Sequence, residues 1–451
     1  MKRWLWFVGL AIFLTGCSSS GENLWEVRQI TYEKNKNHNL DNNRNFSPND
    51  RWLCYDTRPF NGSIADGQTI EKVNVQTGQE VILYQVAHYV KHKGPGVGAA
   101  SYFPHKDSVI FIHGPDVQRG LVYQKTRRVG AIVPADGSGK RVWADARDVT
   151  FPFTPGALRG GTHRHEPGGP HDEWVGFTYN DLIMKRYGES IGKDLDLRTV
   201  GVTHLGHSVR VDADSAGENR SGIGFSVVVV KVVPNPKPGT DQISHAAGDR
   251  WVGEKGYPKP DGTYQLARAF LGKLASGKEE VFIVDIPRDI TQPGPDGPLE
   301  GTPTTFPNPP KGTVQRRLTH TASGCAGNVS SNPQGTRLSF LSKDAKSRWQ
   351  IFLISPLGGK MRQATFFRSG VQGEARWLPG GKAFVCVAHN RIYRVNADEN
   401  SPHFGKATAL TGEFEQPPSN LVAGHTGKIV AFNLERNHQL QIFVAEAPKR
   451  K

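Results

Sequence analysis

The residues of this chain whose types and spacing best suit chemistry are two histidines, His163 and His165, separated by one arginine. In a β-strand, side chains at positions i and i+2 lie on the same face, so both imidazoles are expected to point in one direction. Imidazole nitrogens are common ligands of divalent transition metals. The pair is therefore a candidate site for manganese or a similar divalent ion. The same residues also fit a second interpretation, in which both histidines are hydrogen-bonded at a junction of the fold without a metal.

Four further residues are candidates for roles around such a metal. His113 and His38 are candidates for a third ligand or a general base. Arg147 and Arg159 are candidates for holding substrate carboxylates in bidentate fashion. A metal would acidify the proton next to a substrate carboxylate, and the base would remove it. No Gly-x-Ser-x-Gly motif occurs, which argues against a serine hydrolase.

A short turn followed by an apolar strand recurs along the chain, and this repeat must position the candidate residues. The copies are Phe46–Tyr55, Tyr102–Phe111, Ser331–Phe340, Trp377–Cys386 and Val422–Ala431, with a stretched copy over His165–Phe177. The last three copies begin at 331, 377 and 422, and these intervals are close to the roughly 40 to 45 residues of a four-stranded propeller blade. With 51 glycines and 30 prolines, the composition favours a turn-rich, all-β protein.

The segment between the stretched copy, which begins at His165, and the copy that begins at Ser331 is too long for one regular blade. Its apolar runs are Phe225–Val233, Leu266–Leu274, Glu280–Pro287 and Gln315–Thr319. Counted as one enlarged blade, they give a seven-bladed propeller of four-stranded antiparallel blades; if the region is an insertion, the number is six. The N-terminal stretch Trp25–Thr31 looks like a blade-ending strand and is expected to pair with Leu440–Ala445, closing the ring over residues 24–448. His163 and His165 would then lie on the innermost strand of the third blade, beside a central channel.

The repeat Ser47-Pro-Asn-Asp-Arg-Trp-Leu-Cys-Tyr55 resembles the WD40-like repeat of TolB-type propellers. Further stretches are similar to a bacterial propeller family called DUF3748 or YidR-like. They are Asn37–Leu40, Phe111–Pro115, Arg147-Asp148, Leu158–His165, Phe177–Asp181 and Asn332–Gly335. This resemblance implies the fold and little about function, since propellers host many unrelated chemistries.

Oligogalacturonate lyases are also similar, as seven-bladed propellers that hold a divalent metal with a His-x-His pair and a glutamine three residues before it. In this chain Gly160 stands at the position of that glutamine. The resemblance thus implies a metal-dependent lyase for acidic oligosaccharides, and the glycine puts the metal site in doubt.

The N-terminus has the order of a lipoprotein signal peptide. A basic start precedes the apolar run Trp4–Leu14, which at about 11 residues is too short to span a bilayer. The run ends in Leu-Thr-Gly-Cys17, the pattern of a lipobox. We expect cleavage after residues 1–16 and lipidation of Cys17 with acyl chains such as palmitate. Because Ser18 is not an aspartate, the outer membrane, facing the periplasm, is favoured; the alternative is a plain signal peptide with a chance cysteine.

The remaining cysteines and the net charge limit partners. Cys54, Cys325 and Cys386 are odd in number, and Cys54 and Cys386 fit small buried hydrophobes. The formal charge of +14 favours acidic partners over nucleic acid, which is in the wrong compartment. We expect a monomeric, non-catalytic binding propeller for an envelope protein or an anionic glycan. The rivals are the metal-dependent lyase and a purely structural scaffold.

Overall fold

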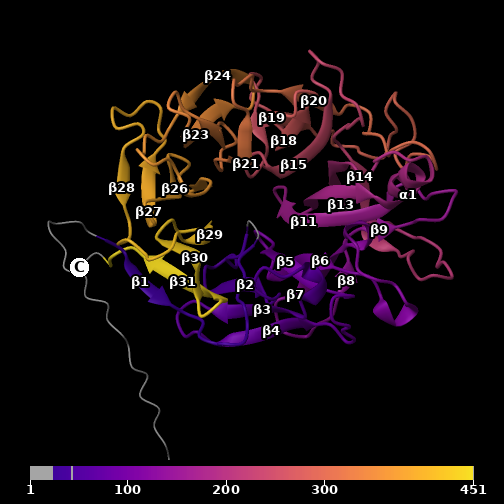
Figure 1. The fold of residues 1–451 in the computed structure, drawn as a ribbon, viewed down its shortest axis with the longest axis horizontal. Helices are drawn as coiled ribbons and strands as arrows, with labels where there is room; N and C mark the ends of the chain where they lie inside the picture. The colour runs from indigo at the N-terminus through magenta and orange to yellow at the C-terminus, as the bar shows by residue number, and fades with distance from the viewer. Residues whose placement is uncertain (1–23, 42–43, 450–451) are drawn as a thin grey trace, which may run out of the picture.

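The protein is a ring of seven β-sheets around a central axis, seen along that axis in Figure 1. This computed structural model describes residues 24–41 and 44–449. The expected signal peptide and Cys17 lie outside the described residues. Within the described part, no helix is both long enough and apolar enough to cross a bilayer.

Each sheet is one blade, and within a blade consecutive strands pair in antiparallel fashion from the axis outwards. Blade 1 consists of β2 (Trp52–Asp56), β3 (Thr69–Asn74) and β4 (Glu80–Gln85). Blade 2 consists of β5 (Val97–Tyr102), β6 (Ser108–His113), β7 (Val129–Pro134) and β8 (Val142–Trp143). Blade 3 consists of β11 (Gly160–Gly168), β12 (Trp174–Asp181), β13 (Arg198–Val209) and β14 (Gly222–Val228). Blade 4 consists of β15 (Ile243–Trp251), β18 (Ala267–Leu274), β19 (Glu279–Asp285) and β20 (Val314–Arg317).

The remaining blades follow the same order. Blade 5 consists of β21 (Cys325–Ser331), β22 (Leu338–Lys343), β23 (Trp349–Ser355) and β24 (Gly358–Gln363). Blade 6 consists of β25 (Arg376–Trp377), β26 (Ala383–Ala388), β27 (Arg391–Asn396) and β28 (Ala407–Ala409). Blade 7 consists of β29 (Ser419–Ala423), β30 (Ile429–Arg436), β31 (Gln439–Glu446) and β1 (Glu26–Gln29).

Smaller elements connect the blades. They are the pair β9 (Ala146–Arg147) and β10 (Ala157–Leu158), the hairpin β16 (Tyr257–Pro258) and β17 (Tyr264–Gln265), the helix α1 (Leu182–Ser190), and the 3-10 turns η1 (Ile64–Asp66), η2 (Val117–Arg119) and η3 (Lys125–Arg127). In blade 1 the innermost position has isolated bridges, Asn39 to Asp56 and Phe46 to Leu53, in place of a regular strand.

The ring closes between the two ends of the chain, as the sequence predicted. The N-terminal strand β1 pairs with the C-terminal β31, with Val27 opposite Ala445. The pairing covers a sheet edge that would otherwise expose unpaired backbone groups. The prediction of a closing strand is confirmed.

The recurring turn lies in the same place in the blades that carry it, between the innermost strand and the next one. It joins β5 to β6, β21 to β22, β25 to β26 and β29 to β30. The count of seven blades is confirmed. One assignment was wrong, because the run beginning at Phe225 forms the outer strand β14 of blade 3 and does not belong to the enlarged blade. Blade 4 instead begins with β15, which the sequence analysis did not recognise.

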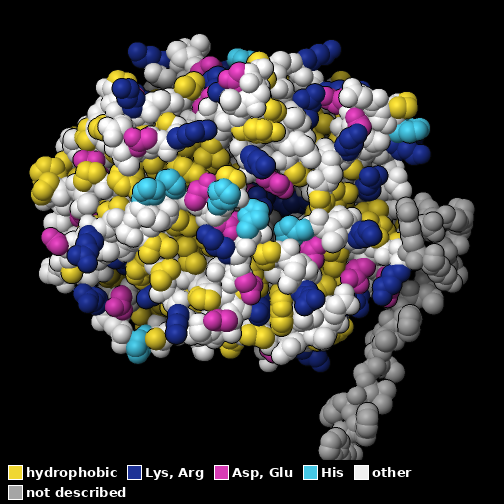
Figure 2. All heavy atoms as spheres, turned by 180° about the vertical axis from the view of Figure 1, so that it is seen from behind, with side chains coloured by type: hydrophobic (Ala, Val, Ile, Leu, Met, Phe, Trp, Pro, Cys, Tyr) yellow, Lys and Arg dark blue, Asp and Glu magenta, His cyan; other side chains and the backbone are white. Residues whose placement is uncertain are grey.

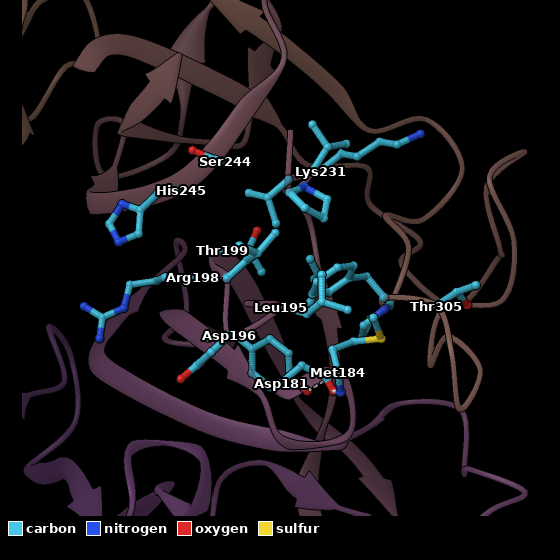
Figure 3. A pocket seen from close by; sticks show the side chains of 18 of the residues that line it. Asp181, Met184, Leu195, Asp196, Arg198, Thr199, Lys231, Ser244, His245 and Thr305 are labelled. Carbon is cyan, nitrogen blue, oxygen red and sulfur yellow. Dashed lines mark hydrogen bonds between the residues drawn. The ribbon is translucent and has the colours of Figure 1, made fainter. Parts of the chain in front are cut away.

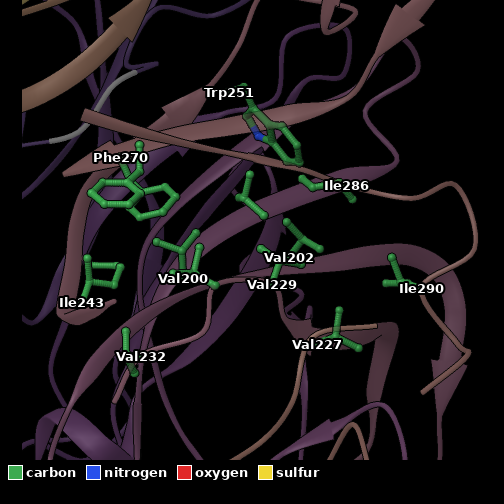
Figure 4. Close-up of a cluster of buried hydrophobic side chains, with 14 of the residues drawn as sticks. Val200, Val202, Val227, Val229, Val232, Ile243, Trp251, Phe270, Ile286 and Ile290 are labelled. Atoms are coloured by element: carbon green, nitrogen blue, oxygen red, sulfur yellow. The ribbon is translucent and has the colours of Figure 1, made fainter. Parts of the chain in front are cut away.

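Apolar side chains hold neighbouring blades face to face. The largest contribution comes between blades 3 and 4, where valines of β13 and β14 such as Val200 and Val227 pack with Trp251 and Phe270 (Figure 4). Each large apolar side chain fully buried in this way stabilises the fold by about 1.5–3 kcal/mol. This packing explains why the run from Phe225 is β-branched on both faces. Cys54, Cys325 and Cys386 are buried and free, so the interpretation of Cys54 and Cys386 as small buried hydrophobes is confirmed.

Candidate functional site

His163 and His165 lie on β11, the innermost strand of blade 3, as predicted, but their imidazoles bind different partners. Arg164 between them has a positive φ of 51°, and the pairing of β11 with β12 shifts register between His163 and Glu166. Such a bulge interrupts the regular alternation of side chains. The two imidazoles therefore contact different partners, both at the junction of blades 2 and 3.

Both ring nitrogens of His163 are engaged by protein groups. Its Nδ1 lies 3.0 Å from Nη1 of Arg128, and its Nε2 lies 3.1 Å from Oδ1 of Asn180. Arginine only donates, so Nδ1 accepts from Arg128 and the Nε2–H donates to Asn180. Burial, with the charges of Arg128 and Arg198, holds the pKa of His163 well below its ordinary value. The ring is thus a neutral hydrogen-bonding group next to a cation, which does not suit a metal ligand.

His165 belongs to a small buried network with Thr162 and Asp145. Its Nε2 lies 2.8 Å from Oγ1 of Thr162, and that hydroxyl lies 3.3 Å from Oδ2 of Asp145. Burial lowers the pKa of His165 to about 3 and raises the pKa of Asp145 to about 6. Gly130 contributes its backbone N–H to the same carboxylate at 2.7 Å. The network ties the inner strand of blade 3 to blade 2.

The other two histidines do not join the pair. His113 ends β6 in blade 2, where its Nε2 lies 3.0 Å from the Tyr84 hydroxyl and its Nδ1 lies 2.7 Å from a backbone carbonyl. His38 is buried between blades 1 and 7, with its Nε2 3.3 Å from Glu80. Among the described residues, no group of three or more His, Cys, Asp or Glu side chains is placed to hold a metal ion. The residues present do not fit the divalent metal that the His-x-His spacing indicated.

The two candidate arginines are buried in ion pairs of the protein itself. Arg147 contacts Glu218 at 2.5 Å and the carbonyl of Gly160 at 2.6 Å. Arg159 contacts Asp181 at 2.9 Å and donates to carbonyls of the loop over residues 302–305. Both guanidinium groups are therefore committed to structural contacts and are not available to a ligand's carboxylate.

A cavity of about 1340 Å³ lies between blades 3 and 4, and its lining does not include His163 or His165. Its walls come from α1, β13, β15 and the loop over residues 296–308. Arg198 and His245 lie on one side of it and Thr305 lies on the other (Figure 3). Charged groups of both signs alternate with apolar ones along it.

A smaller hollow of about 310 Å³ lies on the ring axis, and sequence reasoning missed it. Its lining comes from the inner segments of blades 1, 3, 4, 5, 6 and 7, which meet only at the axis. It includes Arg44, Arg250 and Arg376 together with Trp251 and Trp377. Seen from behind, the molecule has a hollow near the middle of this face with Lys or Arg side chains in its wall (Figure 2).

A sequence signal for this hollow existed. Arg250-Trp251 and Arg376-Trp377 are the same dipeptide at the ends of two inner strands, β15 and β25. Arg44 lies two residues before Phe46, the aromatic residue at the start of the first repeat. The proline and glycine of the recurring turn define the repeat, and the basic residue that precedes the aromatic one lies outside this pattern.

Comparison with known proteins places the chain in a family. A family described as "Protein of unknown function (DUF3748)" matches residues 96–218, and "Uncharacterized protein YidR" of Escherichia coli (strain K12) is 37% identical over 408 residues. That alignment covers 87% of this chain and 91% of its relative. The chain belongs to the YidR-like family. The prediction made from its motifs is confirmed.

One solved structure, a lyase, supports the fold of this YidR-like chain, and a second is similar over most of its length. An "Oligogalacturonate lyase in complex with manganese" superposes with a TM-score of 0.55 and 12% identity, covering 94% of each chain. A "putative TolB from Agrobacterium tumefaciens" aligns with 85% of this chain and 99% of its own, at a TM-score of 0.41 and 13% identity. At such low identity, these likenesses concern the fold.

Proposed function

We propose that this protein is a lipid-anchored binding propeller of the bacterial envelope that takes an anionic glycan at the mouth of its axial hollow. The observation that carries the proposal is the lining of this hollow, in which Arg44, Arg250 and Arg376 lie beside Trp251 and Trp377. Guanidinium groups recognise carboxylates, and aromatic side chains offer apolar surface with a polar edge. A volume of about 310 Å³ is at the small end of ligand pockets and suits one acidic sugar unit rather than a folded protein segment.

Polar groups on the same wall support a sugar as the ligand. Ser330, Ser331 and Asn332 line the hollow at the end of β21. Hydroxyl and amide groups both donate and accept hydrogen bonds, which is the chemistry that sugar hydroxyls need. The hollow therefore combines charge, apolar surface and neutral polar groups.

A binding function is favoured over the lyase by the chemistry of the inner strands. His163 holds Arg128 and Asn180, and within the described chain no cluster suits a metal ion. The fold likeness to the lyase brings no substrate to this chain. An envelope protein as the partner is left as an outcome of the binding test.

The binding test uses the full-length protein in detergent. We expect trigalacturonate, as an acidic probe, to bind at least tenfold more tightly than maltotriose, and binding to weaken as salt rises. Isothermal titration calorimetry measures both. If trigalacturonate does not bind at low ionic strength while an envelope protein is retained in a pull-down, the glycan proposal fails and the partner is a protein.

The anchor is tested separately. Cys17→Ser removes the thiol that would carry the lipid, whereas Ser19→Ala alters a nearby residue outside the Leu-Thr-Gly-Cys motif. We expect only the Cys17 variant to lose palmitate labelling and to leave the membrane fraction. Equal labelling of both variants would remove the lipoprotein proposal and leave the binding proposal intact.

A further inference from the structure

Arg250 is buried with part of its guanidinium group unpaired. Its exposed fraction is 7%, and neither Nε nor Nη2 has a hydrogen-bond partner among the described residues. A guanidinium stays protonated in proteins, and burying a charged donor without a partner costs several kcal/mol. Burial and the neighbouring Arg376 both lower the pKa of Arg250, which reports the same unfavourable surroundings. The described residues of the protein therefore supply no hydrogen-bond partner for these two nitrogens.

The nearest carboxylates on one side are committed to another arginine. Glu166 accepts from Nη1 of Arg268 at 3.0 Å, and the same oxygen accepts the backbone N–H of Trp251 at 3.0 Å. Asp249 also pairs with Arg268. One guanidinium is thus neutralised by two carboxylates, and neither carboxylate makes a hydrogen bond to Arg250.

The carboxylate on the other side is also occupied. Glu374 accepts from the backbone and side-chain nitrogens of Asn328 at 2.9 and 2.7 Å. Its second oxygen lies 3.4 Å from Nη1 of Arg376. Arg376 in turn donates its Nε to a backbone carbonyl at 2.7 Å. Glu374 attracts Arg250 through space but does not bind it.

The charges around the hollow do not balance. The interacting groups are the guanidiniums Arg44, Arg164, Arg250, Arg268 and Arg376 and the carboxylates Glu166, Asp249 and Glu374, and the exposed Glu254 also lines the hollow. Five cations against four anions leave a surplus of one positive charge. Poor access of water strengthens the mutual repulsion of the buried cations. A bound group with one negative charge would remove this imbalance.

The position of the surplus is open to a ligand. Arg44, Arg250 and Arg376 line the axial hollow, and Nε of Arg44 is a second buried nitrogen without a hydrogen-bond partner among the residues that the structure describes. Figure 2 shows a hollow near the middle of one face of the molecule, with Lys or Arg side chains in its wall. A ligand that enters the axial hollow meets the three guanidinium groups that line it.

We propose that Arg250, with Arg376 and Arg44, forms an oxyanion subsite that receives the acidic group of the ligand. The shared chemistry is a carboxylate or a phosphate, since both match the fork of guanidinium donors. The assignment to a sugar carboxylate rests on the proposed function, whereas the subsite itself rests on the unpaired nitrogens of Arg250 and the surplus charge.

The test compares Arg250→Gln with Arg288→Gln, an exposed arginine of the same blade, so that both variants lose one positive charge. The probes are glucuronate, inorganic phosphate and glucose, titrated into the full-length protein in detergent at low ionic strength. We expect the Arg250 variant to lose roughly 10- to 100-fold in affinity for an anionic probe, the range given by charged hydrogen bonds of about 1.5–3 kcal/mol. The Arg288 variant should bind as the unaltered protein does.

The outcomes separate the subsite from the proposed function. Glucuronate binding that survives in Arg250→Gln overturns the subsite and leaves the function standing. Phosphate binding that needs Arg250, without any glucuronate binding, keeps the subsite and removes the acidic sugar. If neither anion binds the unaltered protein, both proposals fall.

Thermal unfolding without anions gives a readout that a structural role would not produce. Removing an unpaired buried charge should leave the melting temperature of Arg250→Gln equal or higher, because the desolvation of the cation and its repulsion by Arg376 outweigh its attraction to Glu374, and no side-chain hydrogen bond among the described residues is lost. Phosphate or glucuronate should then raise the melting temperature of the unaltered protein and not that of the variant. A variant that melts lower in anion-free buffer would mean that Arg250 serves the fold, and the subsite would be overturned.

Discussion

The ion pair between Arg159 and Asp181 gives the sharpest test of how blades 3 and 4 are joined. Arg159 is fully buried, and its guanidinium contacts Asp181 at 2.9 Å and the carbonyls of Thr302 and Thr305 at 2.5 and 3.0 Å. Asp181 belongs to blade 3, whereas both threonines belong to the long loop of blade 4. One side chain therefore holds that loop, which lines the cavity of about 1340 Å³.

Arg159→Met removes the cation and leaves Asp181 buried without its charge partner. Breaking a buried pair in this way costs about 3–5 kcal/mol, and hydrogen bonds from a charged donor to the two carbonyls add roughly 1.5–3 kcal/mol each at most. The free energy of unfolding should fall by at least about 5 kcal/mol, a large part of the stability of an ordinary domain.

The double variant Arg159→Met/Asp181→Asn should recover about 2–3 kcal/mol of that loss. Asparagine removes the unpaired charge and can still cap α1, where Oδ1 of Asp181 accepts from Met184 N. Its amide NH2 then faces the Tyr179 hydroxyl in place of the second carboxylate oxygen, and that hydroxyl can accept where it now donates. Urea unfolding measures the free energies, and hydrogen exchange over residues 296–308 measures the loosening of the loop. Arg288→Met is the exposed control.

Two results would refute this reasoning. A loss below 1 kcal/mol for Arg159→Met would mean that the pair contributes little. A double variant no more stable than the single one would mean that the uncompensated charge of Asp181 is not the source of the loss.

Three further predictions follow from the same contacts. The pKa values of His113 and His165 in the folded protein are about 3 against an ordinary 6.5, so the free energy of unfolding should be full above pH 6.5 and fall on acidification towards pH 3. Asp145, whose pKa is raised to about 6, opposes this fall with one proton. In urea titrations, His113→Asn should reduce the slope of the free energy against pH by up to about 1.4 kcal/mol per pH unit. Full-length protein dialysed against manganese should retain no stoichiometric metal by elemental analysis, and His163→Ala should cost about 1–3 kcal/mol of stability by leaving its partners unpaired; retained metal lost in that variant would contradict the site as described. Deleting Glu26–Gln29 should expose the edge of β31 and cause self-association in light scattering, and a variant that remains monomeric with unchanged melting would contradict ring closure by β1.

The repeat could be predicted from the sequence because its turn chemistry is local. Proline, glycine and aspartate at fixed places mark the turn after the innermost strand. An apolar strand follows this turn, and the whole pattern recurs at the spacing of propeller blades. The closing strand could be predicted for the same reason, since Trp25–Thr31 ends like other blade-ending strands.

The enlarged blade was misassigned because a β-branched run does not state which strand it pairs with. Phe225 belongs to β14, which pairs with β13 of blade 3, although the valines after it pack against blade 4. The inner strand β15 carries glycine and charged residues in place of an apolar run, and a second hairpin separates it from β18. Long-range pairing decides both cases, and no local signal records it.

The arrangement of the candidate histidines could not be predicted from the sequence, and the reason is one backbone angle. The argument for a shared metal required regular alternation through Arg164, but a non-glycine residue with positive φ is uncommon and the sequence gives no sign of it. Without the alternation, His163 turns to Asn180 and His165 turns to Thr162. Both histidines make hydrogen bonds at the junction of blades 2 and 3.

The hydrogen-bond partners of these side chains favour Arg250 over the histidines as the residue that binds a ligand. His163 has both nitrogens paired within the protein, so the fold alone accounts for it. Arg250 has two nitrogens without a hydrogen-bond partner in the part of the chain that the structure describes, and a well-packed apolar side chain of similar size would serve stability better at that place. A buried cation that the fold does not need, at the point where the inner strands converge, is explained most simply by a ligand that supplies the opposite charge.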